Sequence, residues 1–220
     1  MKRRDFACCC GLISILILFG GAAGARAEEP YHAWSVGARG GPSFFTQDPV
    51  TDANITGALG PTFGGVIVYD LHPFVSFGFE AEWEQHKIDR AALTLGDAST
   101  VSLLIRFEAH LKRTRPVSPY FLFAGGYNLN SFSEEGAYLA ACGEDCRIHI
   151  DNGFAIKAGF GADMFLLFEH AAINVEIAWK YNRADVDFLS GGSVVGSDDF
   201  NASSLSVALG FRYHFPVNPF

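Results

Sequence analysis

The sequence predicts an all-β fold, an eight-stranded antiparallel up-and-down transmembrane β-barrel. The first observation is that apolar residues occupy every second position over several segments of about ten to thirteen residues. A tilted strand that crosses a bilayer takes ~9–11 residues, whereas strands of globular proteins are most often about five or six residues long. The second is that short and long connections alternate between these segments. Because lipid cannot satisfy backbone polar groups, strands of this kind must close into a ring without edges.

The composition fits this prediction and excludes other classes of protein. The chain has 220 residues, a length that suits one domain, and 49% of them are hydrophobic, which argues against disorder. Asp and Glu number 24 against 16 Lys and Arg, so a nucleic-acid partner is not expected. Gly at 24 and Phe at 21 suit a β-protein whose aromatic side chains have an apolar environment to face.

The third observation concerns the N-terminus, which is typical of a cleaved secretory signal peptide over residues 1–27. Lys2, Arg3 and Arg4 form a positive region, Leu12–Phe19 a short apolar core, and Ala25–Ala27 a small-residue cleavage site. The apolar core is short for a spanning helix, which takes ~20 residues, although an N-terminal membrane anchor is the alternative. Residues 28–220 then form the barrel domain, and no apolar run of eighteen residues remains in them.

Each strand is predicted from its own alternation, and the clearest example is Phe74–Glu84. Apolar Phe77 and Phe79 share one face of that segment, and Glu80 and Glu82 lie on the other. Four more segments alternate as cleanly, at Val101–Lys112, Phe154–Leu166, Ile173–Asn182 and Ser204–Phe215. Three glycine-rich segments alternate less cleanly, near Ala33–Phe45, Leu59–Leu71 and Pro119–Asn130.

The polar face of these strands is predicted to line the interior, and the apolar face to contact lipid. A soluble, lipocalin-like barrel would have the two faces reversed, and this alternative stays open. The predicted interior charges, either a structural network or an ion-selective lining, are Arg39, Glu80, Glu82, Glu84, Arg106, Glu108, His110, Lys157, Asp163, Glu176, Lys180 and Arg212, with Asp70 and His214 on the same face. The interior of an eight-stranded barrel is just wide enough for side chains to fill it.

The connections predict which end of the barrel faces outward. Short connections at 70–73, 112–118 and 167–171 are expected at the periplasm, and long polar loops at 46–57, 86–99, 131–152 and 183–201 outside. Aromatic residues near the strand ends are expected at the two membrane interfaces; they are Trp34, Trp83, Tyr120, Trp179, Tyr181, Tyr213 and Phe215.

Cys142 and Cys146, the two cysteines of residues 28–220, are predicted to form a disulfide in the third long loop. Together with His149 they suggest a zinc site as a weaker alternative. One short cluster of this kind is weak support for a metal site, so the sequence predicts no metal and no cofactor.

The chain resembles the small OmpA/OmpX-type outer-membrane β-barrel proteins over residues 28–220. The resemblance rests on Phe211–Phe215, on Pro119–Tyr127 and on the rhythm of short turns and long loops. It implies an integral outer-membrane location, contact with lipid and lipopolysaccharide, and insertion by the outer-membrane assembly machinery. Family members usually end on an aromatic residue, so Phe215 is expected to end the barrel, with Pro216–Phe220 following it.

The family resemblance indicates the fold of this chain more reliably than its function. We expect a monomer with a structural or surface-interaction role through four extracellular loops, with an unidentified extracellular ligand. The alternative is a narrow porin-like channel for small solutes or ions. Some eight-stranded outer-membrane barrels are lipid A hydrolases that use a His-x-Ser pair. A lipid A-modifying enzyme is less favoured here, because no histidine of this sequence is followed two residues later by serine. The sequence thus predicts a protein that is not an enzyme.

Overall fold

The chain folds into a closed ring of eight antiparallel strands, as seen in a computed structural model that describes residues 34–50, 55–90, 93–111, 116–166 and 170–215. Consecutive ring strands pair with each other, and the last pairs with the first, so the predicted barrel is confirmed. The predicted signal peptide and residues 216–220 lie outside the described residues. The ring strands are β1 (Trp34–Phe45), β3 (Gly60–His72), β4 (Val75–Arg90), β5 (Leu93–His110), β6 (Val117–Glu134), β8 (Gly153–Phe165), β9 (Ala171–Ser190) and β11 (Ser204–His214).

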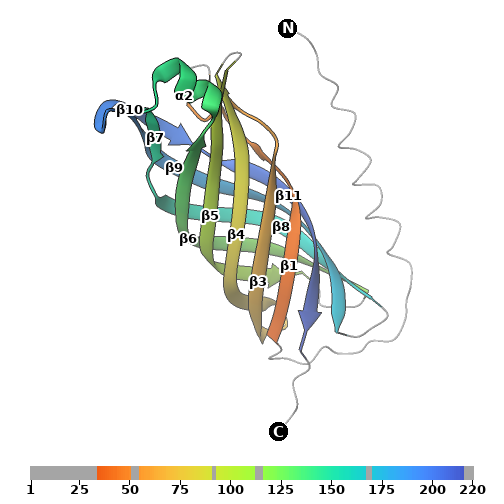
Figure 1. The fold of residues 1–220 in the computed structure, drawn as a ribbon. Helices are drawn as coiled ribbons and strands as arrows, with labels where there is room; N and C mark the ends of the chain where they lie inside the picture. Colours follow the sequence, from red (N-terminus) through yellow and green to blue (C-terminus); the bar gives the residue numbers. More distant parts are fainter. Residues whose placement is uncertain (1–33, 51–54, 91–92, 112–115, 167–169, 216–220) are drawn as a thin grey trace.

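Four smaller elements lie at one end of the ring, which we call the outer end (Figure 1). They are the strands β2 (Ile55–Gly57), β7 (Arg147–Ile150) and β10 (Ser193–Asn201) and the helix α2 (Gly136–Cys142). At the opposite, inner end β1 begins and β11 ends. Within the described part of the chain, no helix is long and apolar enough to cross a membrane.

The ring closes between β1 and β11, and this junction shows why small residues occupy β1. Ala38 pairs with Phe211 on one side and with Gly65 of β3 on the other. A side chain at Gly41 would collide with the Val207 carbonyl oxygen of β11, so the close approach requires glycine. The next residue, Pro42, lies opposite Pro61 of β3, and neither has an N–H to donate to the ladder.

The two faces of the wall carry opposite chemistry, as the sequence predicted. Large apolar side chains point outward, among them Phe79, which is 61% exposed, and Phe123, which is 58% exposed. Charged and hydroxyl side chains point inward and are buried. Leu104 is an exception to this rule: it points inward and packs against Ala124 and Ala155.

Two predicted loops are wrong, because the flanking strands continue through them as paired hairpins. Segment 86–99 is a paired hairpin of β4 and β5 in which His86 lies opposite Ala98. Segment 183–201 is a hairpin of β9 and β10 in which Asp185 lies opposite Asp199. The physical reason is that water replaces lipid outside the membrane, so polar residues there are outward strand residues and do not mark loops.

A closed ring of this kind should withstand cold detergent. We expect the unboiled protein to migrate at a different apparent mass from the boiled protein in a dodecyl sulfate gel. The ring itself has no free strand edge from which unfolding can start, so its ladder hydrogen bonds are expected to open together. Identical migration before and after boiling would contradict a closed barrel.

Candidate functional site

The interior of the barrel holds a network of buried charges. All twelve residues that the sequence assigned to the interior lie there, and each is at most 7% exposed. Five of the twelve are cations, six are carboxylates and one is a histidine. Alternation along each strand positions them, since β4 alone directs Glu80, Glu82 and Glu84 to one face.

Arg106 of β5 is the centre of this network. Its three guanidinium nitrogens contact Glu80 at 2.6 Å, Glu108 at 2.7 Å and Glu176 at 2.6 Å. Because Glu80 is on β4 and Glu176 on β9, one side chain joins opposite walls of the barrel. Arginine suits this position because its planar fork presents five donors in fixed directions.

Two further cations fill the next level toward the outer end. Lys157 of β8 contacts Glu80 at 2.7 Å, Glu82 at 2.5 Å and Glu176 at 3.3 Å. Arg39 of β1 pairs with Glu80 and lies 3.2 Å from Glu176. Each of these two cations therefore forms ion pairs with carboxylates of both β4 and β9 and, like Arg106, links opposite walls of the lumen.

The network ends in two smaller groups. Toward the inner end, Arg212 contacts Glu108 at 2.8 Å and Asp163 at 3.0 Å. His110 completes this group, with Nε2 3.3 Å from Glu108 and 3.1 Å from the Ser76 hydroxyl.

Toward the outer end, Lys180 pairs with Glu84 and lies 3.3 Å from Glu82. Glu84 also accepts hydrogen bonds from Ser43 and, at 2.6 Å, from His86. His86 stacks on Phe45 and contacts the Ala58 carbonyl at 3.0 Å, so it ties the charged interior to the outer segments.

Tyr120 is the one predicted interface aromatic that the structure places elsewhere. It is fully buried in the lumen, where its hydroxyl accepts a hydrogen bond from Asn174 at 2.8 Å and donates to Glu176 at 3.2 Å. Its neighbours Phe121 and Phe123 point outward, which fixes Tyr120 on the inner face. A tyrosine suits either place, because its ring is apolar and its hydroxyl needs a partner.

The other predicted interface aromatics lie on the outward face. Trp34, at the inner end, is 52% exposed and packs against Tyr69. Tyr213 and Phe215 lie at the same end, and the Phe215 N–H donates to the Trp34 carbonyl at 2.7 Å. The remaining three, Trp83, Trp179 and Tyr181, are partly exposed and lie toward the outer end.

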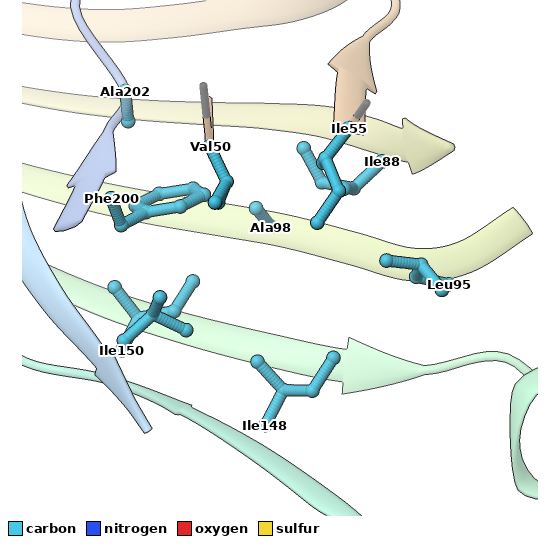
Figure 2. Packing of buried hydrophobic residues seen from close by; sticks show 10 residues of the cluster. Val50, Ile55, Ile88, Leu95, Ala98, Ile148, Ile150, Phe200 and Ala202 are labelled. Atoms are coloured by element: carbon cyan, nitrogen blue, oxygen red, sulfur yellow. The ribbon is translucent and has the colours of Figure 1, made fainter. Parts of the chain in front are cut away.

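Above the charges, the outer end contains an apolar core that was not predicted. Figure 2 shows its side chains pointing into a shared interior from several strands and loops. The buried members are Val50, Ile55, Ile88, Leu95, Ala98, Ile148, Ile150, Val186, Phe200 and Ala202. The signal was present in β4, where the inward positions change from Glu84 and His86 to Ile88 while the outward positions change from Trp83 to Lys87.

Sequence reasoning also missed the neutral polar groups between the charges and the apolar core. Ser102 donates to Asn128 at 2.7 Å, and Thr100 donates to Asn130 at 2.9 Å. They share the inward positions of their strands with the charged residues. The same alternation would have located them if uncharged residues had been included in the interior set.

The helix α2 closes over the apolar core at the outer end. Tyr138 packs against the core, and burial raises the pKa of its phenol, with a further increase from nearby Glu134. A disulfide joins Cys142, the last residue of the helix, to Cys146, whose Cα lies 6.1 Å away. Among the described residues, no three His, Cys, Asp or Glu side chains are grouped to hold a metal ion.

Comparison with known proteins supports the fold. No family model and no curated protein matches the chain. Solved structures do match: the outer membrane protein OprG from Pseudomonas aeruginosa has a TM-score of 0.67 at 17% identity, over 85% of this chain and 98% of OprG. AlkL, solved in lipid bilayers, has a TM-score of 0.58 at 15% identity, over 91% of this chain and 98% of AlkL. Neisserial surface protein A has a TM-score of 0.51 at 13% identity, over 84% of this chain and 97% of its own.

The fold and the lipid-facing surface together define the class of protein. The chain has the architecture of the small OmpA/OmpX-type outer-membrane β-barrels, and it is an integral outer-membrane protein. The resemblance and the location predicted from the sequence are confirmed at this level. The likeness does not carry a specific role, because the identities are low and one fold hosts several functions.

Proposed function

We propose that the barrel is a non-conducting support that presents its outer hairpins for interactions at the cell surface. The observation that carries this proposal is the ion-pair network across the lumen, in which Arg106, Lys157 and Arg39 each form ion pairs with carboxylates on opposite walls. Buried ion pairs are costly to break, because each separated charge is left without a partner. A structure closed in this way holds the outer elements in a fixed geometry.

The apolar core at the outer end adds to this support. It joins the loop residue Val50, the short strand β7 and the hairpin strand β10 to the ring strands β4 and β5. Side chains from these elements pack together in a buried cluster above the charges (Figure 2). The proposed surface is therefore a packed extracellular domain rather than a set of independent loops.

We also propose that the protein acts without catalysis. His110 contacts Ser76 and Glu108, a combination of residue types that can perform acyl transfer in other settings. All three side chains are at most 6% exposed and lie among the interior ion pairs, which argues against contact with a substrate. The partners we propose are lipid and lipopolysaccharide around the wall, the assembly machinery during insertion, and an extracellular ligand; the protein would be a monomer.

The rival role is a narrow channel, and conductance in planar bilayers separates the two. We expect no single-channel steps from the purified, refolded protein, because ion passage requires Arg106 and Lys157 to release their carboxylates. Glu82→Lys adds a cation beside Lys157 and Lys180 and serves as the test variant. Regular steps whose cation selectivity falls in Glu82→Lys would overturn the proposal and establish the channel.

The surface role is tested separately on whole cells. Cells that produce the barrel with the β9–β10 hairpin replaced by a short turn should lose attachment to surfaces that wild-type cells bind. The control removes residues 137–145 and leaves that hairpin intact. Equal attachment by cells with wild-type barrel, either variant or no barrel would contradict a surface-interaction role.

A further inference from the structure

Among the described residues, no strand pairs with one edge of the hairpin strand β10. It pairs with β9 along one side and ends the strand order of the sheet, while β7 pairs with the other side of β9. The seven residues from Ser193 to Asp199 are all exposed. Figure 1 shows this hairpin extending away from the barrel at the outer end.

The hydrogen bonds of neighbouring residues show which way the β10 backbone points. The Asp199 N–H donates to the carboxylate of Asp198 at 2.8 Å, and the Asn201 N–H donates to the Pro49 carbonyl at 2.8 Å. Alternate residues of a strand direct their backbone groups to the same side, so the backbone N–H of Ser197 also points away from β9. The lower part of the edge is thus satisfied internally, and among the described residues nothing accepts the Ser197 N–H.

The side chains of the open part are unusual for an unprotected edge. Val194 is 55% exposed and Val195 is 68% exposed. Proteins commonly protect such edges with charged residues or proline, because an open apolar edge recruits other strands. Asp198 and Asp199 protect the lower part, but Ser193–Ser197 contains no charge and no proline. Its pairing with β9 shifts between Val194 and Gly196, a bulge that increases the local twist, but no charged side chain and no proline bars a partner strand from this upper edge.

The outward face of this sheet carries more carboxylates than cations: Asp151, Asp185, Asp187 and Asp199 accompany Arg147 and Arg183, and His149 lies 3.2 Å from Asp151. Asp199 lies directly opposite Asp185, and the Asp151 N–H donates to the Asp185 carbonyl at 2.9 Å, so three aspartates form one row across β10, β9 and the end of β7. Asp187 lies in the next row on the same face, opposite Ser197. Like charges directly opposite each other destabilise a sheet, and a cationic partner would relieve the repulsion.

We propose that β10 is a docking strand for an extended, basic segment of another protein. The segment adds to the sheet beside Ser193–Ser197 and places Lys or Arg side chains over the aspartate rows. This inference rests on the proposed surface role and names the class of partner. A second copy of the chain fits less well, because two acidic faces would meet at the junction.

The test uses the full-length barrel in lipid nanodiscs and a fluorescent nine-residue peptide that alternates Lys and Val. Fluorescence anisotropy measures its affinity and that of a peptide with the same composition in two blocks, KKKKKVVVV. The alternating peptide should bind more tightly, because only it presents all its cations on one face of a strand. Equal affinity of the two peptides would mean plain charge attraction and would overturn strand addition.

Two substitutions at one position isolate the backbone contact. Ser197→Pro removes the outward N–H without removing a bond to β9, and an edge strand tolerates proline at such a place. Compared with Ser197→Ala, which loses the same hydroxyl contact with Asp187 but keeps the N–H, we expect Ser197→Pro to bind about fivefold more weakly through the loss of one hydrogen bond. Equal losses in both variants would overturn the proposal.

Two further measurements do not depend on that substitution. A peptide N-methylated at every residue has no N–H left to donate to a strand edge and should bind wild-type protein less tightly than the unmodified peptide. Asp185→Asn with Asp199→Asn should weaken binding and reduce its salt dependence. If neither effect occurs while cells still attach through the hairpin, this inference fails and the proposed surface role stands.

Discussion

Replacing Arg106 by methionine is expected to lower the free energy of unfolding of the barrel by about 3–5 kcal/mol, because it leaves buried charges without their partner. Glu80, Glu108 and Glu176 would each lose a contact of 2.6–2.7 Å in a region without access to water. The measurement is urea unfolding in detergent micelles, followed by the fluorescence of the three tryptophans. Methionine keeps much of the side-chain volume, so the result reports on charge rather than on packing.

The matched control for this variant is Arg90→Met. Arg90 ends β4 at the outer end and is exposed, so the same chemical change should alter the free energy of unfolding by no more than about 0.5 kcal/mol. A loss below about 1 kcal/mol in Arg106→Met would contradict a network that holds the interior together.

Placing a charge on the lipid-facing wall should lower the free energy of unfolding by nearly as much as the Arg106 substitution. Ile105 is 50% exposed, lies on the outward face of β5, and pairs with Phe79 and Gly125. We expect Ile105→Arg to lower the free energy of unfolding by about 2–4 kcal/mol, because the guanidinium must leave water for hydrocarbon. Unfolding in vesicles of defined lipid is the measurement.

The control for that variant is on the same strand and the same face. Ser99 lies six residues away toward the outer end, opposite Gln85 and Ser131, where polar residues line the outward face. Ser99→Arg should be within about 0.5 kcal/mol of wild type. If Ser99→Arg destabilises as much as Ile105→Arg, the membrane does not end between these two residues.

The sequence was sufficient for the barrel and for the membership of its interior. A strand has a strict period of two, so the placement of Glu82 or Arg212 inside follows from their immediate neighbours. The pairing of these charges did not follow, because contacts such as Arg106 with Glu176 join residues 70 positions apart and depend on strand register. Glycine-rich β6 had too weak an alternation to place Tyr120, whose chemistry suits both the interface and the interior.

The extent of the outer hairpins was missed for a different reason. Alternation was interpreted with one rule, apolar outward, along the whole chain. In β9 the outward residues are Trp179 and Tyr181 in the membrane and Asp185 and Asp187 beyond it, while Val186 turns inward. The period is unbroken, and only the chemistry of the two faces exchanges where lipid gives way to water.

The junction between β1 and β11 has a consequence for the order of folding. Among the interior groups of β4, β5, β8 and β9, six carboxylates accompany only three cations, Arg106, Lys157 and Lys180. The other two cations of the network, Arg39 and Arg212, belong to the first and last strands of the ring. A half-formed sheet therefore carries surplus negative charge that repels itself, and that repulsion is relieved when the two end strands meet. Association of the chain ends is thus favoured electrostatically, which offsets part of the entropy lost in closing so long a loop.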